Sequence, residues 1–128
     1  MRKAFIESLR ERDIIPAERL KTLRHLIRTA PEPIGSIAFS YGMITGGDID
    51  LVLEQQRKDH RRFGELAMSM GMLTLKQVST LLQIQELRGA MEVAEALALS
   101  GVCTFEDMVS QLGRFFAQES VSLGRSGC

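Results

Sequence analysis

Apolar residues recur along the chain at every third or fourth position, which is the spacing of amphipathic helices. Between Phe63 and Met70 they fall at i, i+3, i+4 and i+7, on one helical face. A second run with the same spacing follows Thr74. No segment long enough for a strand alternates apolar and polar residues, and aromatic residues make up only 5% of the chain. A sheet therefore has little support. The pattern predicts an all-α fold.

One stretch of this pattern occurs twice. The sequence P-I-G-S-I-A-F-S-Y-G-M-I-T begins at Pro33, and R-F-G-E-L-A-M-S-M-G-M-L-T begins at Arg62, an offset of 29 residues. A repeat of this length cannot bury its own apolar face and needs a neighbour. We therefore expect tandem repeats, each made of a short helix, a glycine stop and a second helix.

The residues at the expected helix ends support this division. Gly42 and Gly71 follow the short helices, where glycine adopts the left-handed conformation without a Cβ penalty. A threonine then precedes each second helix, with an acid or amide three residues later, which is the spacing of a capping box. The boxes are Thr45 with Asp48, Thr74 with Gln77 and Thr104 with Asp107.

Two weaker copies flank the clear pair. Asp13 stands where the first would need its glycine, in a conformation that aspartate adopts less comfortably, and Gly101 stands there in the last. We predict four repeats, two clear and two degenerate, packed as one small helical domain. The predicted segments are an N-terminal helical repeat 1–32, the clear pair 33–85, a C-terminal helical repeat 86–118 and a flexible Gly- and Ser-rich tail 119–128.

The composition limits the partners that we expect. Sixteen Lys and Arg balance sixteen Asp and Glu, so no overall field holds the chain on nucleic acid or on an anionic membrane. Cys103 and Cys128 form no disulfide framework, and neither a signal peptide nor an apolar run of the roughly 20 residues needed to span a bilayer is visible. We expect a cytoplasmic protein with no nucleic-acid partner and no direct membrane insertion.

Catalytic chemistry lacks support. The sequence contains no phosphate-binding loop, no nucleophile elbow and no dinucleotide fingerprint. His25 and His60 lie near no cysteine or paired carboxylates at metal-ligand spacing. We therefore expect a protein that is not an enzyme and that needs no metal or other cofactor.

Two features allow more than one interpretation. Methionines gather around the repeat corners, where they either fill the core or form an adaptable binding groove; they are Met43, Met68, Met70 and Met72. Gly46 and Gly47 stand in the first turn of a predicted helix, where each costs roughly 1 kcal/mol relative to alanine. Either something approaches the backbone closely there or the turn is irregular.

The clear pair resembles the twin 24-residue motifs, separated by five residues, of the MshEN family. Here the first motif is Pro33–Gln56, the spacer is Arg57–Arg61 and the second motif is Arg62–Gln85. MshEN domains form the N-terminal region of type II secretion and type IV pilus ATPases, and members bind cyclic di-GMP. The resemblance does not extend to the ATPase domain that usually follows.

The resemblance implies a set of ligand-binding residues. Arg62 would stack its planar guanidinium on a guanine, Gln56 would hydrogen-bond a base edge, and the glycines would let the backbone approach the ligand. The implied set is Ile34, Gly35, Ile37, Gln56, Arg62, Phe63, Gly64, Leu66 and Gln85, with Ala67 adding apolar contact.

The first motif departs from the family pattern at Pro33, which replaces an arginine and lacks a side-chain donor. Two hypotheses follow. In the first, the protein is a non-enzymatic receptor or adaptor that binds cyclic di-GMP as a regulatory ligand and signals to a partner protein. In the second, it is an interaction module of secretion, type IV pilus or motility machinery that has lost the nucleotide.

Overall fold

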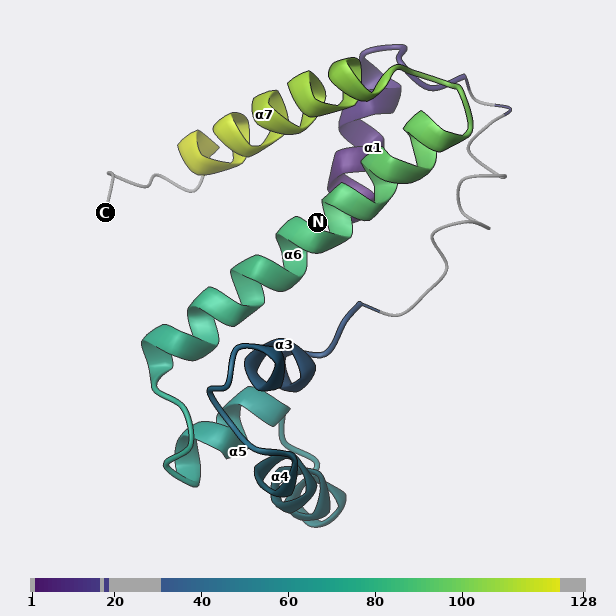
Figure 1. Ribbon diagram of the computed structural model, residues 1–128. Helices are drawn as coiled ribbons and strands as arrows, with labels where there is room; N and C mark the ends of the chain where they lie inside the picture. The colour runs from purple at the N-terminus through teal and green to yellow at the C-terminus, as the bar shows by residue number, and fades with distance from the viewer. Residues whose placement is uncertain (1, 17, 19–30, 123–128) are drawn as a thin grey trace. The chain divides into compact units, whose positions relative to one another are not determined.

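The computed structural model describes residues 2–16, 18 and 31–122, and these residues form helices without any strand. Figure 1 shows short connections between successive helices from α3 to α7. They are α1 (Arg2–Glu11), α3 (Ile34–Ser40), α4 (Gly46–Asp59), α5 (Phe63–Ser69), α6 (Leu75–Leu99) and α7 (Phe105–Ser122). The predicted all-α fold is confirmed, whereas the tandem arrangement of four repeats stays a prediction. The second helix expected in the first repeat lies largely outside the described residues.

The chain divides into two compact units. Unit 1 comprises Met1–Ala30 and Leu87–Cys128, and unit 2 comprises Pro31–Glu86. The limits of unit 2 lie within two residues of the predicted limits 33 and 85 of the clear pair. The twin motifs therefore make one compact body of their own.

Two helices extend beyond their predicted ends. Helix α6 passes without interruption across the predicted boundary between residues 85 and 86. No proline stands within it, and its single glycine, Gly89, costs only about 1 kcal/mol in a helix interior. Helix α7 reaches Ser122, so residues 119–122 of the predicted tail are helical.

The expected left-handed helix stops are confirmed. The φ angles of Gly42, Gly71 and Gly101 are 72°, 75° and 78°, and that of Asp13 is 57°. The glycine position of each predicted repeat thus has a left-handed backbone conformation, even where the residue is an aspartate. This agreement places all four helix stops where the sequence pattern predicts them.

The capping boxes are confirmed at two of the three sites. The Thr45 Oγ1 accepts from the Asp48 amide at 3.0 Å, and the Asp48 carboxylate accepts from the Thr45 amide at 3.0 Å. Thr74 and Gln77 exchange the same pair of bonds at 2.9 and 3.1 Å. At the third site the Asp107 amide donates to Thr104 Oγ1 at 3.1 Å. These side chains satisfy amides that a helix start leaves without partners.

Each unit has its own apolar core. In unit 1, Phe5 and Leu9 of α1 are fully buried, and the Phe5 and Phe115 rings lie 5.3 Å apart. Arg12 strengthens the same link by donating to Gln111 at 2.7 Å and to Gln118 at 3.0 Å on α7. The core of unit 2 is formed by Ile34, Ile37, Ala38, Ile44, Val52, Leu66, Ala67, Leu73, Val78 and Leu81.

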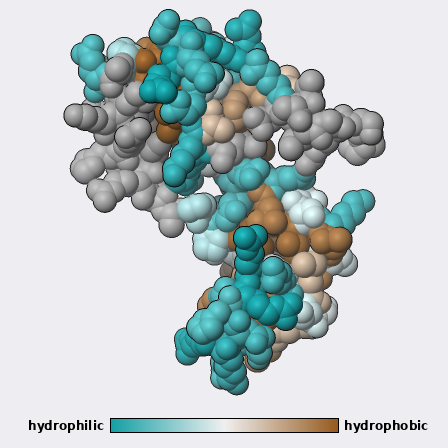
Figure 2. Space-filling view, turned by 180° about the vertical axis from the view of Figure 1, so that it is seen from behind, coloured by the Kyte–Doolittle hydropathy of each residue, from teal (hydrophilic) through white to brown (hydrophobic). Residues whose placement is uncertain are grey.

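Three of the corner methionines pack partly buried against the core of unit 2; they are Met43, Met68 and Met72. Met70 is 39% exposed. Core filling therefore accounts for most of the cluster. Large apolar side chains elsewhere are also exposed, and part of the apolar surface appears brown in Figure 2.

Candidate functional site

The two short helices of unit 2, α3 and α5, contact each other at their glycines. A Cβ added to Gly35 would lie 2.8 Å from Cζ of Phe63, closer than atoms normally approach. A Cβ added to Gly64 would lie 2.8 Å from Val78 Cγ1 and 3.4 Å from Ile34 Cδ1. The residue ahead of each glycine thus packs on the other glycine. Side chains of the protein itself occupy the space that the resemblance assigns to a ligand at these positions.

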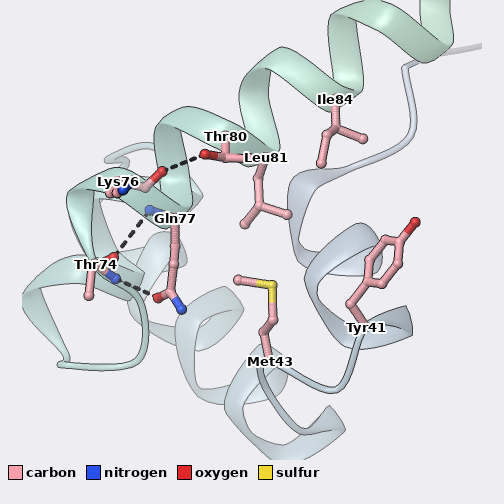
Figure 3. A pocket seen from close by; sticks show the side chains of 8 residues that line it. All are labelled: Tyr41, Met43, Thr74, Lys76, Gln77, Thr80, Leu81 and Ile84. Carbon is pink, nitrogen blue, oxygen red and sulfur yellow. Dashed lines mark hydrogen bonds between the residues drawn. The ribbon is translucent and has the colours of Figure 1, made fainter. Parts of the chain in front are cut away.

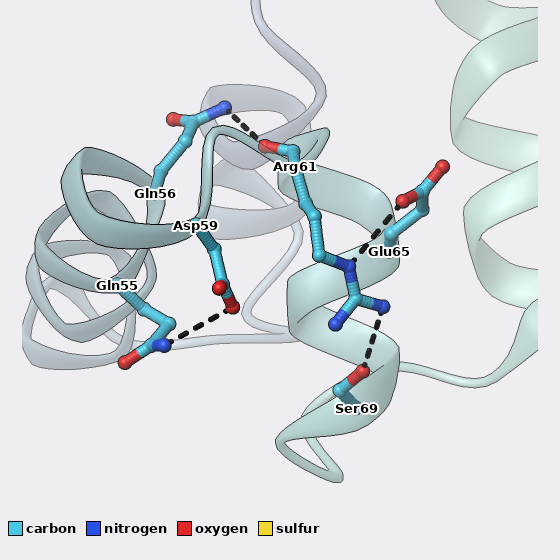
Figure 4. Close-up of polar contacts among 6 residues, drawn as sticks. All are labelled: Gln55, Gln56, Asp59, Arg61, Glu65 and Ser69. Carbon is cyan, nitrogen blue, oxygen red and sulfur yellow. Dashed lines mark hydrogen bonds and ion pairs between the residues drawn. The ribbon is translucent and has the colours of Figure 1, made fainter.

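The closing glutamines of the motifs make equivalent hydrogen bonds. Gln56 Nε2 donates to the carbonyl oxygen of Arg61 at 3.0 Å, as Figure 4 shows. Gln85 Nε2 donates to the carbonyl oxygen of Glu32 at 2.9 Å. Both carbonyls belong to the residue immediately before a motif, so each glutamine holds the chain at the entry to a short helix. The glutamine of the first motif therefore binds the residue before the second motif, and the glutamine of the second motif binds the residue before the first.

Arg62 stands at the N-cap of α5 and is exposed, beside the carbonyl that Gln56 holds. Among the described residues its guanidinium makes no hydrogen bond or ion pair. Arg61, in contrast, lies along α5, where its Nη2 donates to Ser69 Oγ at 3.3 Å and its Nε is 3.6 Å from Glu65 Oε2 (Figure 4). Arg62 therefore directly follows, along the chain, the carbonyl that Gln56 holds.

The apolar members of the implied set lie in the interior. Ile34 is 7% exposed, Ile37 0% and Leu66 2%, and the two glycines between the short helices are also buried. Ala67 is buried as well, whereas Phe63 is half-buried. A ligand on the surface of unit 2 can thus reach Arg62, Phe63 and the half-buried glutamines directly, whereas the rest of the set is buried.

The closing glutamines keep hydrogen-bonding capacity. A primary amide has two N–H donors and a carbonyl acceptor, and each bond to a main-chain carbonyl uses one donor. Gln56 is half-buried, so the remaining amide atoms lie near solvent. The amide is held in place and can still bind a base edge.

The two glycines of the α4 first turn have open space around them. A Cβ at Gly46 would meet nothing within 4 Å, and one at Gly47 would meet only Thr45 Oγ1 at an ordinary 3.7 Å. Helix α4 begins at Gly46 with a complete capping box. The turn is regular, so the interpretation as an irregular turn is wrong, and no described part of the chain approaches this backbone closely.

Sequence reasoning missed a second feature of unit 2, a groove of about 350 Å³ at the start of α6. Tyr41 and Met43 line one side, and side chains between Thr74 and Ile84 line the other (Figure 3). None of the residues implied to bind a ligand lines it. The corner methionine Met43 was the available signal, because methionine is common on adaptable binding surfaces.

The described residues contain neither a cluster of metal-ligating side chains nor a membrane-spanning helix. No group of three or more His, Cys, Asp or Glu in these ranges is arranged to hold a metal ion. None of the described helices combines the length and the apolar character needed to cross a membrane.

Comparison with protein-family models, with curated proteins and with solved structures finds no match. The resemblance to MshEN domains therefore depends on the residues and register of the two motifs alone.

Proposed function

We propose that unit 2 binds cyclic di-GMP and that the protein is a non-enzymatic receptor or adaptor that passes this signal to a partner by contact. The observation that carries the proposal is the hydrogen bond from Gln56 Nε2 to the carbonyl oxygen of Arg61. It holds the closing amide of the first motif next to the exposed Arg62. Arginine supplies a planar group on which a guanine can stack, and glutamine supplies an amide edge that a guanine can hydrogen-bond.

The ligand has two guanines, and unit 2 has two equivalent entries. At the second entry Gln85 holds the carbonyl of Glu32, in the same relation as Gln56 and Arg61. Pro33 stands there in place of an arginine. We expect one strong and one weak half-site, with a loss of about 1 to 3 kcal/mol relative to a site with two arginines.

Calorimetric titration of the full chain with cyclic di-GMP tests the proposal. We expect saturable binding that Arg62→Ala weakens about tenfold or more, because the stacking cation is removed. Arg114→Ala makes the same charge change on an exposed residue of unit 1 and serves as the matched control. Absence of saturable binding up to about 100 μM, a free energy weaker than roughly −5.5 kcal/mol, would contradict the proposal.

A second candidate is an interaction module of secretion, type IV pilus or motility machinery that has lost the nucleotide. The packing of Phe63 on Gly35 favours it, because this contact explains the glycine without any ligand. Capture of the same identified partner with and without cyclic di-GMP, together with a failed titration, would support this candidate over the first.

A further inference from the structure

The groove at the start of α6 is open and largely apolar at its base. Leu81 is buried at the base, and Met43 and Ile84 are half-buried, while Tyr41 is 66% exposed at one edge (Figure 3). Its volume of about 350 Å³ lies at the lower end of the range of ligand pockets. The groove thus offers apolar contact area on a surface that solvent reaches.

Several hydrogen-bonding groups that line the groove are already used, and the base of the groove has only apolar side chains. Thr74 and Gln77 exchange two hydrogen bonds with each other's main-chain amides, and the Thr80 hydroxyl donates to the carbonyl of Lys76 at 2.9 Å. The Gln77 amide keeps its N–H donors, but the apolar base offers an occupant no hydrogen bonds. An extended peptide or a nucleotide would leave its own polar groups without partners, whereas a helix satisfies its backbone internally.

The charge on the groove indicates which side chains a docked helix should carry. Among the described residues that line the groove, Lys76 carries the charge and none is a carboxylate. An apolar helix face that carries an acidic side chain near this ammonium would gain attraction, and one that carries a lysine would meet repulsion. Because the groove is open to solvent, an acyl chain bound in it would expose part of its apolar surface to water. An amphipathic helix would instead expose its polar face.

The first motif does not reproduce this surface. The residues 29 positions before Lys76 and Ile84 are Gly47 and Gln55, so the cation and one apolar wall are absent there. Leu51 corresponds to Thr80. The two motifs, which otherwise correspond, therefore differ at the groove. Unit 2 has one such surface and not two.

We infer that this groove docks an amphipathic helix of a partner protein, with large apolar side chains over Met43, Leu81 and Ile84 and an acidic side chain facing Lys76. This surface goes beyond the proposed nucleotide site, because it shares no residue with that site. It gives the adaptor a place to contact its partner.

Titration of the isotope-labelled full chain with two helical peptides of about 18 residues tests the inference by NMR. Both peptides carry the same leucine stripe, one with glutamates beside it and the other with lysines. At low ionic strength we expect the acidic peptide to bind about tenfold more tightly, with shifts centred on Tyr41, Met43 and Ile84. Lys76→Glu should reverse the preference, and Tyr41→Ala should weaken both peptides.

Lys58→Glu makes the same charge change on an exposed residue of α4 and should leave the preference unchanged. Three outcomes would overturn the inference: no shifts with the acidic peptide at about 1 mM, shifts centred outside the groove, or an equal effect of Lys58→Glu and Lys76→Glu. Since cyclic di-GMP is absent from this titration, its failure is distinguishable from failure of the nucleotide proposal.

Discussion

The ring of Phe63 lies directly against Gly35, so that a Cβ at residue 35 would fall 2.8 Å from ring atom Cζ. We expect Gly35→Ala to lower the free energy of unfolding by about 1 to 3 kcal/mol, because the half-buried ring cannot move without disturbing the core. Urea denaturation followed by circular dichroism measures this loss. An unchanged midpoint would show that the two short helices separate easily and that the contact is not tight.

We expect Gly46→Ala, the same type of substitution, to raise the free energy of unfolding instead of lowering it. Nothing lies within 4 Å of the added Cβ, and the residue begins the regular helix α4. We expect a gain of about 0.5 to 1 kcal/mol in the free energy of unfolding, because alanine restricts the unfolded chain and favours the helix. The same denaturation experiment measures it. A loss would indicate a close approach to this backbone that the described contacts do not contain.

Asp13 occupies a left-handed conformation that the other repeats give to glycine, with φ of 57°. Asp13→Gly should therefore stabilise the protein by up to about 1 kcal/mol, since glycine relieves the Cβ strain but loses more entropy on folding. The reverse substitution Gly101→Asp, where φ is 78°, should destabilise it. Thermal unfolding of both variants checks the pair, and shifts of equal sign would contradict the assignment.

Local features of the fold were predictable from sequence because neighbouring residues determine them. The boxes at Thr45 and Thr74 depend on residues three positions apart. The left-handed stop at Asp13 followed from the repeat, since Asp13 stands 29 residues before Gly42. The continuity of α6 across residue 86 was harder to predict, because the repeat frame suggested a new unit there. Nothing in that stretch stops a helix, and the local propensity decided the outcome.

The candidate site was predictable only as a set of residues. The hydrogen bond from Gln85 to Glu32 joins positions 53 residues apart, and no local pattern reveals it. The burial of Ile37 and Leu66 likewise follows from how α3 and α5 pack, not from the motif. The resemblance therefore named Gln56 and Arg62 as candidate residues, while tertiary packing determined which of the other residues face solvent.

Cys103 is half-buried in unit 1, and this burial, together with the negative charge of Asp107, raises the pKa of its thiol above 9.0. In a Cys128→Ser background we expect slow alkylation of Cys103 at mildly alkaline pH, because the reactive thiolate is scarce. Asp107→Asn should increase the rate modestly, since it removes the smaller of the two causes. Mass spectrometry of the alkylated peptide measures both rates.

The same pKa shift affects stability in a known direction. The folded state holds the thiol proton more tightly than the unfolded state, so the stabilisation is complete below the unfolded pKa and is lost as the pH rises through the raised value. The free energy of unfolding should therefore decrease above about pH 9, and Cys103→Ser should reduce that slope. A slope that is identical in the two proteins would show that other groups control the alkaline transition.

Pro33 and Arg62 have nearly the same backbone conformation, with φ and ψ of −62° and 142° at Pro33 and of −66° and 147° at Arg62. An arginine at position 33 can thus adopt the geometry that Arg62 already has, and the Gln85 bond still holds the preceding residue. If unit 2 binds cyclic di-GMP, Pro33→Arg should tighten binding about tenfold to a hundredfold by supplying a second stacking cation.

Two control variants separate this effect from simpler ones. Pro33→Ala removes the proline without adding a guanidinium and should leave the affinity near its original value. Pro31→Arg adds the same charge at an exposed position two residues earlier and should change the affinity less than Pro33→Arg does. Calorimetric titration compares the four proteins. Equal affinities of Pro33→Arg and Pro31→Arg would show that charge alone acts, because a stacking arginine must stand at the entry to α3 to reach the second guanine.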